Sequence, residues 1–181
     1  KGPRSKPLLA QPNQWYKAYN SALHIDNTSI DVYNKSKLVP GAEQMPFQTF
    51  LHPIFGDNIL KIGSSTAVGN FARQDTVSVF YSLNGHRVAP IICYESIYGD
   101  YVRQFVHKGA DAIFIITNDG WWKKTSGYKQ HSMYAQLRAI ETRRYIARSA
   151  NTGISSVINH LGEIEKSILW DKKGIISYEI P

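Results

Sequence analysis

Cys93 is the single cysteine of the sequence, and its position is typical of a reactive thiol. It follows the apolar stretch 87–92, which predicts a strand, and a helix is predicted from residue 98 onward. Side chains at such strand ends project into the crevice where α/β proteins bind ligands. The amides and dipole of a following helix favour a thiolate and stabilise an oxyanion. A lone cysteine is also commonly a small buried apolar residue, so a nucleophile needs partners.

Two charged residues are candidate partners, because none of the six histidines carries a protease-like signature. Lys35 and Glu43 lie eight positions apart and bracket a turn. An ammonium group beside a thiolate stabilises both the thiolate and a later tetrahedral oxyanion, and a carboxylate can take the thiol proton. As isolated residues, both are equally typical of surface charges. One cysteine also excludes an intrachain disulfide and a cysteine-cluster metal site.

These residues lie in segments that resemble the nitrilase, or carbon-nitrogen hydrolase, superfamily, which uses a Glu-Lys-Cys triad on a four-layer α-β-β-α sandwich. The resemblance is closest to the apolipoprotein N-acyltransferases of that superfamily, and the segments run in order over residues 20–165. They are 33–43 (YNKSKLVPGAE), 93–95 (CYE), 118–121 (NDGW), 130–131 (QH), 138–144 (RAIETRR) and 151–155 (NTGIS). The resemblance therefore implies an α/β fold of this nitrilase-like type, incomplete at its N-terminus.

The resemblance also implies a role for each matching residue. Cys93 would be the nucleophile that takes an acyl chain from a phospholipid as a thioester. Lys35 would stabilise the oxyanion together with a backbone amide, and Glu43 would lie near the thiol and orient the lysine. The supporting and substrate-binding residues would be Tyr94, which supplies that amide, Glu95, Asn118 and Trp121.

The implied activity is a transferase step of lipoprotein biosynthesis in the bacterial inner membrane, with the catalytic domain on the periplasmic side. The acyl group would pass to the α-amine of the N-terminal diacylglyceryl cysteine of an apolipoprotein. No metal, organic cofactor or nucleic acid is implied. Two alternatives stay open: a soluble carbon-nitrogen hydrolase (an amidase or nitrilase), whose thioester goes to water, and a catalytically inactive nitrilase-like module that binds a partner.

The sequence departs from the family pattern in two respects. The triad's first glutamate, the general base, should lie well upstream of the lysine, but no glutamate precedes Glu43, and the earlier acids are Asp26 and Asp31. The family's membrane helices have no counterpart, because no run of about 18 apolar residues occurs. No apolar segment follows the basic start, so a signal peptide is not expected either. We therefore expect a fragment of the catalytic domain that lacks full activity.

The composition of the 181 residues, 43% of them hydrophobic, is that of a packed globular domain. A net charge of +7 suits an anionic partner such as a phospholipid surface. The basic residues are scattered without a nucleic-acid motif, which disfavours DNA or RNA binding. Apolar loop residues could receive acyl chains or could equally pack inward as core. They are Phe47, Phe50, Leu51, Ile54 and Phe55 after Glu43, and Trp121 and Trp122 beside Lys123 and Lys124.

A layered α/β domain must position these residues. We expect residues 1–19 to be an irregular lead-in and 20–181 to form the partial catalytic domain. Alternating apolar residues predict one hairpin over 20–26 and 30–33, and a second over 77–81 and 87–92 with its turn at Asn84-Gly85. The continuous apolar run 112–117 predicts a buried central strand.

Two helices and three further strands complete this expectation. The first helix is predicted over 98–107, with Gly109 as its C-cap. The second is predicted over 128–144, with one face formed by Met133, Leu137, Ile140 and Arg144. The further strands are predicted over 145–149, 154–159 and 163–169.

Overall fold

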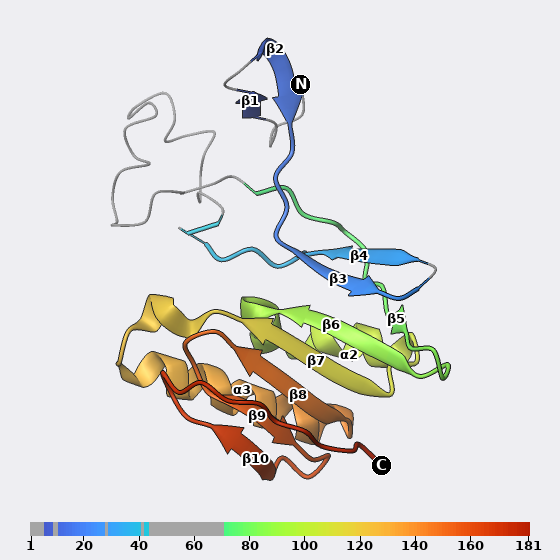
Figure 1. Ribbon diagram of the computed structural model, residues 1–181, viewed down its shortest axis with the longest axis vertical. Coiled ribbons are helices and arrows are strands. Elements are labelled where there is room, and N and C mark those ends of the chain that lie inside the picture. The colour runs from blue at the N-terminus through green and yellow to red at the C-terminus, as the bar shows by residue number, and fades with distance from the viewer. Residues whose placement is uncertain (1–5, 9–10, 28, 41, 44–70) are drawn as a thin grey trace.

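The computed structural model describes residues 6–8, 11–27, 29–40, 42–43 and 71–181. Its main body is one mixed sheet of six strands in the order β10-β9-β8-β7-β6-β5 (Figure 1). The strands are β5 (Phe80–Tyr81), β6 (Arg87–Ile92), β7 (Ala112–Thr117), β8 (Tyr145–Ala150), β9 (Ser155–Ile158) and β10 (Ile164–Ile168). The helices are α2 (Gly99–His107) and α3 (Ser126–Thr142), with 3-10 turns η2 (Cys93–Ile97) and η3 (Asp119–Trp122).

Parallel pairing at the centre of the sheet determines where the helices lie. β6, β7 and β8 are parallel neighbours, so each connection between them crosses over the sheet, through α2 and then through α3. Successive crossovers of the usual right hand that step in one direction place both helices on the same face. Figure 1 shows both helices behind the sheet. The carboxyl ends of these strands, where Cys93 and Asn118 follow, therefore share one edge.

The central strand β7 is buried on one face only, which corrects the expectation of a strand buried on both. Ile113 and Ile115 are fully buried among the core residues beneath α2 and α3, whereas Phe114 and Ile116 point the other way and are 43% and 51% exposed. Its central position in the sheet is confirmed. The six-stranded sheet is thus covered by α2 and α3 on one face, and on its other face Phe114 and Ile116 of β7 form an apolar surface that is about half exposed among the described residues.

The helix predicted over 128–144 is confirmed as α3, but its apolar face does not point into the core. Met133, Leu137 and Ile140 are exposed, while the buried side chains are Tyr128, His131, Ser132, Ala135, Arg138, Ala139 and Thr142. Two small residues, Ala135 and Ala139, let the helix pack closely on the sheet. One of its buried polar groups, the Thr142 hydroxyl, donates to the Arg138 carbonyl at 2.7 Å. The helical spacing of the apolar residues therefore identified the helix but not the face that it buries.

The other predicted elements are largely confirmed. β3 (Ser21–Ile25) and β4 (Ile30–Asn34) form the first hairpin, and β5 pairs antiparallel with β6 as the second, although β5 is shorter than predicted. Gly109 follows α2 with φ +87°, the left-handed conformation of a C-cap glycine. None of the helices in the described part of the chain is long and apolar enough to cross a bilayer.

The N-terminal lead-in is not wholly irregular. β1 (Lys6–Leu8) and β2 (Gln11–Tyr16) pair antiparallel within the segment where irregular chain is expected. Two prolines, Pro7 and Pro12, lie in these strands and are compatible with this ribbon. A two-stranded ribbon consists of edge strands alone, and edge strands tolerate a residue that lacks an N–H donor.

We expect the two faces of β7 to respond differently to truncation. Ile113→Ala should lower the free energy of unfolding by about 3 kcal/mol, because it leaves a cavity in the closed core. Ile116→Ala, the matched change on the open face, should cost about 1 kcal/mol or less. Urea unfolding of both variants measures the difference. Equal losses would show that the Ile116 face is covered as tightly as the core.

Candidate active site

Cys93 occupies a strained backbone position at the carboxyl end of β6. Its φ is +51°, in the left-handed region that residues with a side chain seldom adopt. Such a conformation costs about 1–2 kcal/mol, and it persists where the surrounding contacts hold it. The sharp turn from β6 into η2 leaves the Cys93 side chain half-buried at the sheet edge, as predicted for a strand-end thiol.

A cavity of about 480 Å³ brings several of the predicted site residues together. Its walls include Cys93, Glu43, Asn118 and Trp121, which come from three separate stretches of chain. Apolar atoms of Ile92, Ile116 and Phe71 complete much of the lining. A thiol, a carboxylate and an amide thus face one space with apolar walls, an arrangement suited to covalent chemistry on a substrate with an aliphatic part.

Lys35 stands behind Glu43 and is completely buried. Its ammonium donates to both carboxylate oxygens of Glu43, at 2.9 and 2.7 Å. Glu43 also accepts from the Asn20 side-chain amide at 3.0 Å and from the Val39 N–H at 2.8 Å. Because a buried ammonium needs a counter-charge, this pair fixes the loop that carries Glu43 against the end of β4. The surface alternative for these two residues is excluded.

Glu95 lies on the other side of the Cys93 turn and points into the core. Its side chain is fully buried and accepts four hydrogen bonds, a set that we term the Glu95 clamp. The donors are the Tyr33 hydroxyl at 2.7 Å and the backbone N–H groups of Ser36 (2.7 Å), Lys37 (3.2 Å) and Ile92 (2.8 Å). One carboxylate therefore ties the chain on both sides of Lys35 to the last residue before Cys93.

Burial raises the pKa of two groups in the Glu95 clamp, the Glu95 carboxyl and the Tyr33 hydroxyl. Desolvation raises the pKa of the Glu95 carboxyl, although hydrogen bonds from Ile92 and Tyr33 offset part of that effect. Desolvation, together with the charge of Glu95, likewise raises the pKa of the Tyr33 hydroxyl, which stays protonated as a donor.

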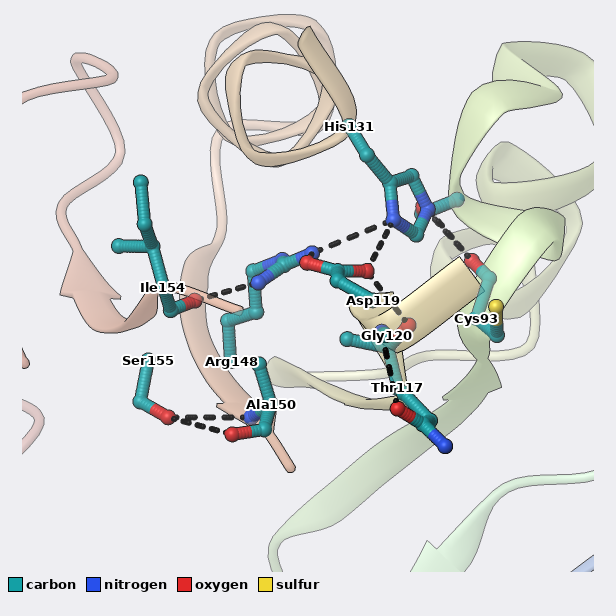
Figure 2. Close-up of polar contacts among 11 residues, drawn as sticks. Cys93, Thr117, Asp119, Gly120, His131, Arg148, Ala150, Ile154 and Ser155 are labelled. Atoms are coloured by element: carbon teal, nitrogen blue, oxygen red, sulfur yellow. Dashed lines mark hydrogen bonds and ion pairs between the residues drawn. The ribbon is translucent and has the colours of Figure 1, made fainter. Parts of the chain in front are cut away.

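A second buried polar group, which we term the Asp119 cluster, was missed as a unit by the sequence reasoning. It consists of Asp119, His131 and Arg148, from η3, α3 and β8 (Figure 2). Asp119 Oδ1 lies 2.8 Å from His131 Nδ1, and Arg148 donates to Asp119 Oδ2 at 2.7 Å. All three side chains are at most 4% exposed. The sequence feature that could have revealed the cluster is Arg148. It lies two residues after the buried Ile146 in the same strand, so its charged side chain is on the buried face.

The pKa of the Asp119 carboxyl lies below its ordinary value. Burial alone would raise it, but the hydrogen bond from His131 and the charge of Arg148 outweigh desolvation. Asp119 is therefore a carboxylate, and its two neighbours are donors to it. Gly153 gives this carboxylate room, because a Cβ there would lie 2.0 Å from Asp119 Oδ2.

The remaining predicted residues divide between the cavity and its surroundings. Asn118 both faces the cavity and accepts from the Gly120 N–H at 3.0 Å, so it contributes to the turn as well. Trp121 and Trp122 are 61% and 43% exposed rather than packed inward as core. The Tyr94 ring packs edge-on against Tyr98 at 5.6 Å. The apolar stretch from Phe47 to Phe55 lies outside the described residues.

Comparison with known proteins gives the geometry a family context. Residues 7–181 match the model of the carbon-nitrogen hydrolase family. Over 171 residues, the chain is 36% identical to the apolipoprotein N-acyltransferase of Chlorobaculum tepidum, covering 92% of this chain and 32% of that protein. It is 36% identical over 149 residues to the enzyme of the same name from Shewanella oneidensis, covering 82% and 28%. The chain thus spans about a third of the length of these curated relatives.

Solved structures share the fold at low sequence identity. A carbon-nitrogen hydrolase from Helicobacter pylori superposes with a TM-score of 0.63 at 16% identity, over 86% of this chain and 54% of that one. Glutamine-dependent NAD+ synthetase from Acinetobacter baumannii gives a TM-score of 0.62 at 18% identity, over 94% and 29%. The expected nitrilase-like α/β fold is confirmed.

The Glu95 clamp predicts a large effect of a nearly isosteric change. Glu95→Gln keeps the size of the side chain but turns an amide NH2 toward at least one of the backbone donors, leaving that N–H unsatisfied. We expect a loss of about 2 kcal/mol or more in the free energy of unfolding, measured in urea. The exposed Glu179→Gln is the matched control and should change stability by less than about 0.5 kcal/mol. Similar small values for both would argue against the clamp.

The Asp119 cluster predicts a stability difference that depends on pH. Because the folded pKa of Asp119 lies below the value of 3.8 in the unfolded chain, its contribution is complete above that pH. It is lost as the pH falls through the folded pKa. We expect wild type to exceed Asp119→Asn in unfolding free energy at pH 7, and the gap to narrow progressively below about pH 4. A gap that widens on acidification would contradict the assignment.

Proposed function

Because this chain belongs to the carbon-nitrogen hydrolase family, we propose that Cys93 is an acyl-accepting nucleophile and that the protein is an apolipoprotein N-acyltransferase. The observation that carries the proposal is the cavity shared by Cys93 and Glu43, with Lys35 buried behind the glutamate. The relatives that are 36% identical bear that enzyme name, which supports acyl transfer in lipoprotein maturation.

The proposed reaction has two balanced steps. In the first, Cys93 Sγ forms a bond to an ester carbonyl carbon of a phospholipid, the bond from that carbon to the ester oxygen breaks, and the lysophospholipid alcohol leaves with the proton lost by the thiol. In the second, the α-amine of a diacylglyceryl cysteine attacks the thioester, a C–N bond forms, and the C–S bond breaks. The proton released by the amine restores the thiol. Both tetrahedral intermediates carry an oxyanion.

The residues around the thiol have separate tasks in this scheme. Lys35 supplies positive charge for the oxyanion, together with the backbone N–H of Tyr94. Glu43 orients the lysine through two hydrogen bonds and forms part of the cavity wall. Asn118 and Trp121 line the space that the substrate would enter. The general base of the family's triad is a glutamate upstream of the lysine, and no glutamate precedes Glu43 in this sequence.

The loop after β7 favours a lipid as the acyl donor. Trp121 contributes to the cavity wall and is largely exposed, and Trp122 is exposed beside it. Lys123 and Lys124 follow directly and are exposed too. Exposed tryptophans beside lysines are typical of loops at a membrane interface, where the rings lie at headgroup depth and the ammonium groups meet phosphate. This placement agrees with an enzyme of the bacterial inner membrane that acts on its periplasmic side.

We expect the full-length gene product to form an acyl-enzyme. Incubation with phosphatidylethanolamine in detergent, followed by intact-mass measurement, should give a fatty-acyl adduct that hydroxylamine removes. Cys93→Ala should give no adduct. Lys35→Met, which keeps most of the side-chain volume but removes the ammonium, should slow adduct formation about 100-fold, because oxyanion stabilisation is lost.

The other outcomes separate the alternatives. Turnover of simple amides by Cys93 without a lipid adduct would indicate a carbon-nitrogen hydrolase. The absence of both a lipid adduct and amide turnover would favour an inactive binding module. An adduct that persists in Cys93→Ala would place the nucleophile elsewhere and contradict the proposal.

A further inference from the structure

The carbonyl oxygen of Cys93 is held on the inner side of the turn. The Ser96 hydroxyl donates to it at 2.8 Å. His131 Nε2 lies 3.3 Å from the same oxygen (Figure 2). The same His131 nitrogen is 3.2 Å from the Ser96 hydroxyl, so the two side chains and the carbonyl form one contact group. Ser96 is 1% exposed and His131 is 4% exposed, which shields these contacts from water.

His131 is itself fixed from behind. Its Nδ1 faces Asp119 Oδ1 at 2.8 Å, and a carboxylate can only accept, so Nδ1 carries a proton and donates to Asp119. Asp119 is anchored by Arg148 at 2.7 Å and by the Thr117 hydroxyl at 3.2 Å. Arg148 also donates to the Ile154 carbonyl. The chain of contacts runs from β8 and the residue before β9 to the turn at Cys93.

Because a peptide unit is planar, contacts that hold its carbonyl also fix the direction of its N–H group. The Cys93 carbonyl and the Tyr94 N–H belong to one peptide unit, which is trans like the others of the described residues. In a trans peptide the C=O and N–H bonds point in opposite directions in one plane. Fixing the carbonyl toward Ser96 and His131 therefore fixes the Tyr94 N–H toward the opposite side, away from the Asp119 cluster.

We propose that Ser96 and His131 are positioning residues of the reaction, which aim the Tyr94 N–H at the oxyanion through the Cys93–Tyr94 peptide. This inference rests on the proposed function, in which that N–H stabilises the tetrahedral intermediate. Asp119 and Arg148 act one step further back by holding the His131 ring. Neither Ser96 nor His131 touches substrate in this scheme.

Two physical effects follow from the contact of Ser96 and His131 with the Cys93 carbonyl. The contact sets the direction of the Tyr94 N–H, because a donor stabilises an oxyanion only when it is already aimed at the place where charge develops. It also polarises the peptide, because hydrogen bonds accepted by a carbonyl strengthen the donor at the other end of the same amide. The left-handed φ of Cys93 makes the first effect necessary, since a strained turn released from these contacts would relax toward another orientation.

The test compares two reactions of the same thiol in the full-length gene product. Acylation by a p-nitrophenyl ester passes through an oxyanion: the S–C bond forms, the aryl C–O bond breaks, and nitrophenolate leaves as a measurable burst. Alkylation by iodoacetamide displaces iodide and forms no oxyanion. Ser96→Ala should slow the burst about tenfold and leave the alkylation rate within twofold of wild type. A role in folding alone would lower both rates together.

Variants of His131 provide a second measurement. A glutamine amide nitrogen can reach the place of the imidazole Nε2, whereas an asparagine amide is too short. His131→Gln should therefore retain more of the burst rate than His131→Asn, with alkylation again unchanged. The exposed His107→Gln is the matched control and should behave as wild type.

Two results would overturn the inference: an unchanged burst rate in Ser96→Ala, or a parallel fall of burst and alkylation in Ser96→Ala and His131→Asn alike. The lipid-adduct experiment distinguishes this failure from that of the proposed function. If wild-type protein gives a burst with the nitrophenyl ester but no adduct from phospholipid, the acyltransferase proposal fails, and the burst rates of the variants still decide the positioning role.

Discussion

A cysteine with a left-handed backbone at the end of a parallel strand stays there only if its neighbours hold it, and this constraint organises the site. Cys93 has φ +51°. The residue before it is fixed by the Glu95 carboxylate through the Ile92 N–H, and its own carbonyl is fixed by Ser96. The turn is thus held at both ends by side chains that the turn itself supplies. Strain of this kind is a common feature of functional sites.

The two carboxylates that flank the turn each connect it to a different part of the fold. Glu95 reaches the chain that follows β4, through Ser36 and Lys37, and so places Lys35 relative to the end of β6. Asp119 connects η3 to α3 and β8 through His131 and Arg148. A buried carboxylate with fewer partners would be strongly destabilising. Both are saturated with donors, and their pKa directions differ because Asp119 has a cation beside it and Glu95 does not.

The sequence pointed to the residues around the cavity better than to the residues that support them. Cys93, Lys35 and Glu43 were singled out because thiol, ammonium and carboxylate have few roles in combination. The structure places Cys93 and Glu43 on one cavity and pairs Lys35 with Glu43, while their chemical roles stay a prediction. The strands were predictable from apolar alternation and turn residues. The buried face of α3 was not, because His131 and Arg138 face inward, against the rule that polar side chains face solvent. The partners of His131 lie on other elements, whereas Arg138 pairs with Glu141 of the same helix at 3.0 Å and with the Ile97 carbonyl of η2 at 3.4 Å. No local pattern of the sequence records the contacts between elements.

The open face of β7 could not be predicted from the run of apolar residues 112–117 either, since such a run is the same for a strand covered on one face or on two. The distinction matters for the site. Ile116 on that face lies in the cavity wall with Cys93, so the apolar surface of the sheet continues into the cavity. A strand that was apolar only toward the helices would leave the thiol beside polar groups. The uninterrupted run therefore serves two surfaces at once, the core through Ile113 and Ile115 and the cavity through Ile116.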